Sequence, residues 1–253
     1  MERLNHKDFE KFQGDWNLFT KVLNTKNIIF LYDLDGILAY SAEKVLGNFR
    51  DRTGIDVRPY KIDSWEYLKR VAIENKLTQQ IIDTSEDDWY NSGVMEQARR
   101  YLYARPLVKL TVSKYGAERN FALTSRPSSF KESSKRWLIK EIPKFPVKNL
   151  LIREEESSYN GSEFKIEKIK DFSPLVDLIV FIDDSTDYVR GVLESGIDNC
   201  LAINVPQGVI KPDFNHEHLI VIGRHPGQMQ SMYPLYKYID IAINDKYDLS
   251  HQD

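Results

Sequence analysis

The sequence of 253 residues has little cysteine, no long apolar run and no large excess of either charge. Its single cysteine, Cys200, excludes an internal disulfide framework and a cysteine-rich zinc site, and favours a reducing, cytoplasmic location. No stretch approaches the roughly 20 apolar residues of a membrane-spanning helix, and the amino-terminal segment is charged throughout, so we expect neither membrane insertion nor secretion. With 35 basic and 38 acidic residues, no global positive field would attract a nucleic-acid polymer or an anionic membrane. Recognition of an anion must therefore be local.

Short apolar runs recur along the chain, separated mostly by helix-like stretches. Each has the length and composition of a strand that is buried on both faces of a parallel sheet. The runs are 28–32, 120–124, 149–152, 178–182, 200–204 and 218–222. This alternation predicts an α/β fold with a doubly wound parallel sheet, in which ligands bind beyond the carboxyl ends of the strands.

The interval 40–105 interrupts this alternation. It contains three helical stripes and no convincing buried strand, and it ends at Arg105-Pro106. We therefore expect a core formed by residues 1–39 and 106–253, with a small helical cap over 40–105 inserted after the first strand. Helical periodicity also predicts a terminal helix over 226–244 and an amino-terminal amphipathic helix that contains Phe9, Phe12, Trp16, Phe19 and Val22.

Acidic residues follow two of the apolar runs. Asp33 and Asp35 come directly after 28–32, and in extended backbone their spacing directs both carboxylates to one side. The run 178–182 ends in Asp183-Asp184. A turn for the first pair and a helix cap for the second are the alternatives. If the two strands are neighbours, the carboxylates converge on a site for Mg²⁺, which prefers oxygen ligands.

Two further segments carry polar groups suited to phosphate. Thr124 closes an apolar run and is followed by Ser125-Arg126-Pro127, with Pro127 suited to the first turn of a helix. The start of such a helix can bind phosphate through a hydroxyl and free backbone N–H groups. Simple capping of the helix by Thr124 or Ser125 is the alternative. Arg126 either pairs with phosphate or lies in solvent. In 161–165, Ser162 suggests a cap and places Lys165 in the first helical turn, where a cation opposes the helix dipole. Lys165 is therefore the candidate cation, with Lys168 as an alternative.

The ordered set Asp33-x-Asp35-Gly36, Thr124, Lys165 and Asp183-Asp184 resembles the four motifs of the haloacid dehalogenase superfamily of aspartate-nucleophile phosphatases. The segment 123–127 and the compact cap look similar to its 5′(3′)-deoxyribonucleotidase branch. The resemblance implies that Asp33 attacks phosphorus and that Asp35 exchanges protons with the leaving oxygen and water. Its backbone carbonyl would help to hold Mg²⁺.

The same resemblance implies that Thr124 binds the phosphoryl group and that Lys165 offsets its charge. Asp184, with Asp183 as support or alternate, would complete the Mg²⁺ site. The substrate is then a small phosphorylated molecule rather than a nucleic-acid polymer or a membrane.

The expected cap is rich in aromatic residues on which a nucleobase could stack, although aromatic residues at helical spacing are more often core. They include Trp65, Tyr67, Trp89 and Tyr90. A nucleoside monophosphate is thus the leading substrate, and Trp65, Trp89, Thr124, Ser125 and Arg126 are the candidate substrate-binding residues. A phosphatase of sugar phosphates and a non-catalytic module that binds phosphorylated ligands are the alternatives. The sequence does not indicate the oligomeric state.

Overall fold

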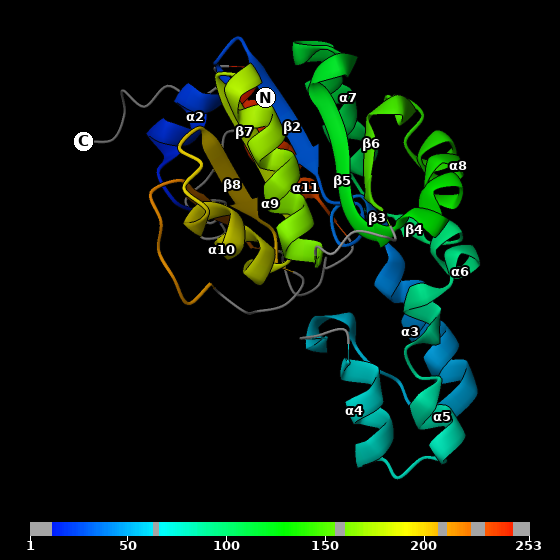
Figure 1. Cartoon of the computed structure of the whole chain (residues 1–253). Helices are drawn as coiled ribbons and strands as arrows, with labels where there is room; N and C mark the ends of the chain where they lie inside the picture. Colours follow the sequence, from blue (N-terminus) through cyan, green and yellow to red (C-terminus); the bar gives the residue numbers. More distant parts are fainter. Residues whose placement is uncertain (1–11, 63–65, 155–159, 207–211, 224–230, 245–253) are drawn as a thin grey trace.

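A sheet of seven strands lies at the centre of the protein in the computed structural model, which describes residues 12–62, 66–154, 160–206, 212–223 and 231–244 (Figure 1). The strand order is β1-β9-β8-β7-β2-β5-β6. All neighbouring strands are parallel except β1, which runs antiparallel to β9 at the edge. The strands are β1 (Phe12–Gln13), β2 (Ile28–Tyr32), β5 (Asn120–Pro127), β6 (Leu150–Arg153), β7 (Leu178–Asp183), β8 (Cys200–Asn204) and β9 (Leu219–Ile222).

The central strand β2 shows why the sheet is covered on both sides. All five of its residues are buried. Because side chains alternate along a strand, Ile28, Phe30 and Tyr32 enter one hydrophobic cluster and Ile29 and Leu31 enter another. A strand that is apolar on both faces therefore needs a layer of helices on each side.

Helices supply these two layers (Figure 1). One face of the sheet packs against α9 (Gly161–Phe172) and α10 (Thr186–Glu194). The other packs against α2 (Trp16–Leu23), α7 (Ala104–Tyr115), α8 (Lys131–Glu141) and α11 (Tyr233–Ile243). The predicted doubly wound α/β fold is confirmed. Among the helices that the structure describes, none combines the length and the apolar character needed to cross a bilayer.

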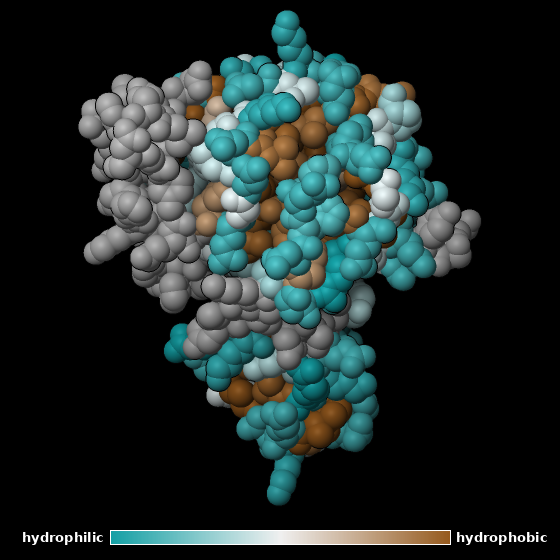
Figure 2. All heavy atoms as spheres, turned by 90° about the vertical axis from the view of Figure 1, so that its left-hand side faces the viewer, coloured by the Kyte–Doolittle hydropathy of each residue, from teal (hydrophilic) through white to brown (hydrophobic). Residues whose placement is uncertain are grey.

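A helical insertion follows the first strand of the core. Its two connections to the core, β3 (Ala39–Tyr40) and β4 (Arg99–Arg100), pair antiparallel as a short ribbon. Between them lie α3 (Ser41–Thr53), α4 (Tyr67–Glu74), α5 (Gln79–Asp83) and α6 (Ser92–Glu96). Figure 1 shows these helices extending away from the sheet, and Figure 2 shows apolar surface on them within a hydrophilic surround. The insertion is the helical cap that the sequence predicts after the first strand.

The two ends of the described chain differ from the predicted helices. Phe12 lies in β1 opposite Ile222, and α2 starts only at Trp16. The reason is local, because the Asp15 carboxylate accepts hydrogen bonds from two backbone N–H groups of the first turn and so fixes the helix start. Phe9 lies outside the described residues. At the other end, α11 begins at Tyr233, and 226–230 also lie outside them.

Candidate active site

The two acidic motifs meet at the carboxyl edge of the sheet. β2 and β7 are parallel neighbours with Tyr32 opposite Ile182, so Asp33 and Asp183 follow at the same level. The Asp33 backbone N–H donates to the Ile182 carbonyl at 2.8 Å, which extends the pairing into the site. One carboxylate oxygen each from Asp33, Asp183 and Asp184 lies within 4.8 Å of the others. The convergence that the sequence predicts for these three residues is present.

Lys165 reaches this cluster from α9. Its Nζ lies 2.9 Å from Asp33 Oδ1 and 2.6 Å from Asp183 Oδ2, and its side chain is 1% exposed. The predicted local setting is wrong, because Asn160 rather than Ser162 caps the helix, in a capping box with Glu163. Lys165 therefore lies in the second turn, where its long side chain can extend to the sheet edge.

Lys168, the alternative cation, is not part of the cluster. Its Nζ forms an ion pair with Asp171 at 2.9 Å on the surface of the same helix. The side chain of Lys168 is 32% exposed, whereas that of Lys165 is 1% exposed. The geometry thus assigns the buried position to Lys165.

Burial and charge perturb the titration of this cluster in opposite ways. Burial raises the pKa of the Asp33 and Asp183 carboxyls well above their usual range, although the Lys165 ammonium opposes the rise. Burial alone would lower the pKa of Lys165, but the two carboxylates raise it on balance. With Lys165 as the nearby cation, burial therefore still favours the protonated form of these two carboxyls.

Asp35 faces a different partner. Arg126 Nε and Nη2 donate to its two carboxylate oxygens, each at 2.7 Å. Burial would raise the pKa of Asp35, but Arg126 and a hydrogen bond from Ser41 lower it overall. Arg126 is itself buried and also donates to Ser134 Oγ at 2.9 Å. Of its two predicted places, solvent is therefore wrong, because the guanidinium is buried and bound to Asp35.

Thr124 and Ser125 lie on β5 at the same edge. Thr124 is buried, and its Oγ1 accepts the backbone N–H of Arg126 at 3.3 Å. Ser125 Oγ donates to the Gly161 carbonyl at 3.2 Å, which links β5 to the start of α9. Pro127 still belongs to β5, and α8 starts at Lys131 after a short 3-10 turn, so the predicted helix start at Pro127 is wrong. After a register shift that follows Thr124, Pro127 pairs with Arg153 of β6, and this pairing keeps the backbone extended.

The aromatic candidates in the cap differ in how far they are exposed. Trp89 is only 9% exposed and belongs to the hydrophobic core, so it does not offer an open ring face for stacking. Tyr67 packs partly buried against the same core. Tyr90 is 65% exposed. Trp65 lies outside the described residues.

Tyr188 is a member of the site that the sequence analysis missed. Its ring lies 4.6 Å from Lys165 Nζ, a cation–π contact, and its hydroxyl is hydrogen-bonded to Ser125. A Cβ at Gly161 would collide with that hydroxyl, which explains the glycine at the start of α9. Nothing in the sequence separates this tyrosine from any other on an amphipathic helix.

The donor set fits a hard divalent cation. Asp33, Asp183 and Asp184 supply oxygen ligands only, which suits Mg²⁺. Asp183 already accepts from Lys165 Nζ at 2.6 Å and from the Ser185 N–H at 2.8 Å, so Asp33 and Asp184 are the better direct ligands. Gly36, with φ of +86°, leaves the space that the Asp184 carboxylate occupies, and any Cβ there would overlap it. These residues can hold the ion that the sequence predicts.

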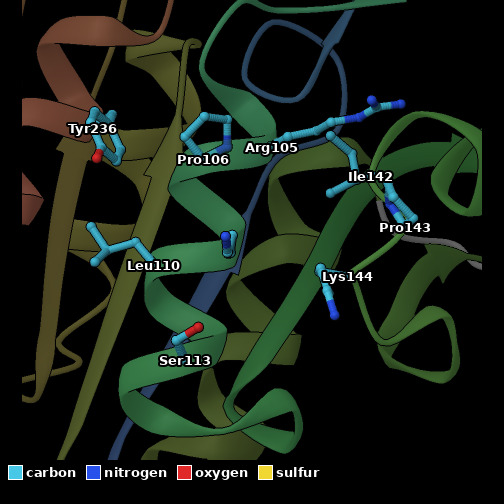
Figure 3. Close-up of a pocket in the computed structure, with 9 residues that line it drawn as sticks. Arg105, Pro106, Leu110, Ser113, Ile142, Pro143, Lys144 and Tyr236 are labelled. Carbon is cyan, nitrogen blue, oxygen red and sulfur yellow. The ribbon is translucent and has the colours of Figure 1, made fainter.

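A separate pocket of about 530 Å³ lies along α7 (Figure 3). Its lining includes Arg105, Pro106 and Leu110 of α7, and Figure 3 shows Tyr236 on one side of this helix and Pro143 on the other. None of the candidate site residues lines it. The candidate chemistry is therefore confined to the carboxyl edge of the sheet.

Comparison with known proteins gives a consistent picture. No family model and no curated protein matches the sequence. Solved structures do match it. A protein of Bacteroides vulgatus assigned as a β-phosphoglucomutase is 13% identical with a TM-score of 0.50, and the match covers 90% of this chain and 99% of that one.

Two further solved structures agree. YfnB of Bacillus subtilis, assigned as a haloacid dehalogenase-type hydrolase and bound to magnesium, is 12% identical with a TM-score of 0.50 over 85% of this chain and 100% of that one. A protein of Bacteroides fragilis assigned as a haloacid dehalogenase-like hydrolase is 18% identical with the same TM-score over 79% and 98%. This chain has the haloacid dehalogenase-like fold. The acidic cluster lies where open α/β sheets of this kind bind their ligands.

Proposed function

We propose that this protein hydrolyses phosphate monoesters with Mg²⁺, and that Asp33 is the nucleophile. The observation that carries the proposal is the cluster in which Asp33 lies beside Asp183 and Asp184 and within 2.9 Å of the Lys165 ammonium. A buried carboxylate with an adjacent cation and an oxygen-ligand site is the arrangement that phosphoryl transfer requires, since that reaction depends on positioning and on neutralising charge. The resemblance of the sequence motifs and the shared fold support the same reaction.

The residues of this chain can be assigned to both steps of the reaction. Asp35 must take up a proton before the first step, because Arg126 favours its ionised form. In that step Asp33 attacks phosphorus, the bond to the leaving oxygen breaks, and the proton passes from Asp35 to that oxygen. In the second step water attacks the aspartyl-phosphate, the bond from Asp33 to phosphorus breaks, and Asp35 takes the proton from water. Lys165 offsets charge beside Asp33, and Thr124, on the strand next to β2, is assigned to bind the phosphoryl group.

The Mg²⁺ site is proposed for Asp33 and Asp184, with Asp183 in support and the backbone carbonyl of Asp35 as a further ligand. When bound, the ion would neutralise charge on the phosphoryl group and fix its orientation. If all four aspartates are ionised, Lys165 and Arg126 balance only part of their charge, and a bound divalent cation would stabilise the ionised forms.

A nucleoside monophosphate is the proposed substrate class. The segment 123–127 resembles the deoxyribonucleotidase branch, and Tyr90 provides an exposed aromatic ring in the cap. A sugar phosphate would need polar contacts from the cap instead.

The first prediction tests the activity and the nucleophile together. Purified protein should release phosphate from p-nitrophenyl phosphate with Mg²⁺ but not with EDTA, and Asp33→Asn should lower the rate at least about 10³-fold. The variant should fold, because burial already favours a neutral side chain at this position. Asp171→Asn makes the same change at a surface carboxylate and should leave the rate unchanged. Binding of nucleotides without turnover by the unmodified protein would instead favour a non-catalytic module.

A further inference from the structure

Arg126 presents its guanidinium to Asp35 as a fork. Nε and Nη2 each donate to a different carboxylate oxygen, both at 2.7 Å. This two-point contact fixes the plane of the carboxylate as well as its distance, which a single donor cannot do. The residue proposed to exchange protons therefore has its orientation set by Arg126.

Arg126 is also hydrogen-bonded on the side that faces away from Asp35. Its Nη1 donates to Ser134 Oγ on α8 at 2.9 Å, and the side chain of Arg126 is only 5% exposed. Ser134 is fully buried. A guanidinium with partners on both sides and little room to move acts as a rigid support rather than as a mobile charge.

A second reading of Arg126 is that it binds the substrate phosphate. In the described structure all three guanidinium nitrogens already donate to Asp35 or Ser134. Contact with phosphate would require Arg126 to break the fork and leave a carboxylate of 17% exposure without its partner. A third reading is that the ion pair only stabilises the fold.

We propose that Arg126 is a positioning residue that aims the Asp35 carboxylate at the leaving oxygen of the substrate. The inference rests on the proposed phosphatase function and goes beyond it by assigning the proton-transfer geometry to a residue that the motifs do not include. It makes a specific demand on substrates. A leaving group that departs readily as an anion needs little help from Asp35, whereas a more basic leaving group needs a well-aimed proton.

The test compares p-nitrophenyl phosphate with phenyl phosphate, whose phenoxide is the more basic leaving group. For Arg126→Met, kcat/KM should fall about 100-fold on phenyl phosphate and less than about 10-fold on p-nitrophenyl phosphate, within the range of general acid catalysis. Arg126→Lys keeps the charge without the fork and should fall between. Ser134→Ala should shift the ratio between the two substrates in the same direction, but less.

A double mutant and a matched control complete the design. If Arg126 acts through Asp35, adding Arg126→Met to Asp35→Asn should cause little further loss. Arg136→Met removes a comparable fork from α8, where Arg136 binds Glu96 at 2.8 and 2.7 Å on the surface, and should leave the substrate ratio unchanged.

The outcomes separate the readings. An equal fall on both substrates for Arg126→Met would overturn the inference and indicate a phosphate ligand if KM rises, or a structural ion pair if the melting temperature falls instead. In either case the phosphatase assignment would stand. Absence of Mg²⁺-dependent hydrolysis of both substrates by the unmodified protein would reject the proposed function, and with it this role for Arg126.

Discussion

At the scale of single residues, the decisive feature is an ammonium group enclosed by carboxylates. Lys165 is 1% exposed and contacts both Asp33 and Asp183, so its charge is compensated almost entirely by those two side chains. Removing one member of a buried ion pair leaves the others charged and without a partner, which costs far more than losing a surface pair. The same contact thus serves both the fold and the proposed chemistry.

This feature predicts a pH-dependent loss of stability. In EDTA, Lys165→Met should be less stable than the unmodified protein, and the gap should widen as the pH rises from about 5 to about 8. The Lys165 ammonium opposes the rise that burial causes in the pKa of Asp33 and Asp183, so its removal should raise both values further. The folded variant then keeps protons up to a higher pH than the folded unmodified protein does, while the unfolded chains release theirs, so rising pH destabilises the variant more. Urea unfolding at several pH values measures the effect, with Lys168→Met as the surface control. A gap of constant size across that range would contradict the explanation.

The sequence predicts the acidic residues of the site more accurately than the side chains that contact them. Asp33 and Asp183 could be predicted because each follows an apolar run, and strand ends are fixed by short-range sequence. Lys165 was found through its unfavourable charge near a helix start, although its cap residue was misassigned. The fork from Arg126 and the contact from Tyr188 could not be predicted, because the direction of a long side chain depends on tertiary packing.

At the scale of elements, the turn after β2 makes room for the proposed metal site. Gly36 adopts φ of +86°, and its missing side chain leaves the space taken by the Asp184 carboxylate. Gly54, at the end of α3, also has a positive φ, of +73°, but nothing lies within 4 Å of a Cβ built there. An alanine at either position would strain the backbone, but only an alanine at Gly36 would also push the Asp184 carboxylate aside.

The comparison gives a prediction. Gly36→Ala should weaken activation by Mg²⁺ by about 10-fold or more, because outer support of a metal ligand typically matters on that scale. Gly54→Ala introduces the backbone strain without a steric clash, so it should leave Mg²⁺ activation unchanged. The measurement is phosphate release against Mg²⁺ concentration for both variants, with melting temperatures in EDTA as a check on folding. Equal Mg²⁺ activation of the two variants would argue against Asp184 as a ligand.

Element positions were predicted well for strands and less well for helix starts. The buried runs coincide with strands because a short, mostly apolar run suits a strand that is covered on both faces. Helix starts depend on one capping residue, and Asn160 and Asp15 each capped a helix elsewhere than periodicity suggested. The extended backbone through Pro127 likewise reflects pairing with β6, which no local pattern specifies.

At the scale of the whole molecule, the sequence predicts the kinds of layers but not how the strands are ordered. The sequence indicated a parallel sheet and a helical insertion, but not the order of the strands or the antiparallel edge strand β1. Those depend on pairing between distant segments. Because Asp35 forms a β-bridge with Ala39 and the β3–β4 ribbon begins at Ala39, the cap is attached to the core beside the proposed chemistry.

The cap therefore gives the last prediction, on substrate class. Tyr90 is 65% exposed, so its ring is available to a nucleobase, whereas Trp89 is needed in the core. Tyr90→Ala should lower kcat/KM for a nucleoside 5′-monophosphate by about 10-fold, as expected for one lost stacking contact, and leave ribose 5-phosphate, which lacks the base, unaffected. Ile73→Ala changes another exposed side chain of the cap, 54% exposed, and should alter neither substrate. Equal effects of Tyr90→Ala on both substrates would show that the ring does not read the base, and would favour a sugar phosphate as the substrate of the same core.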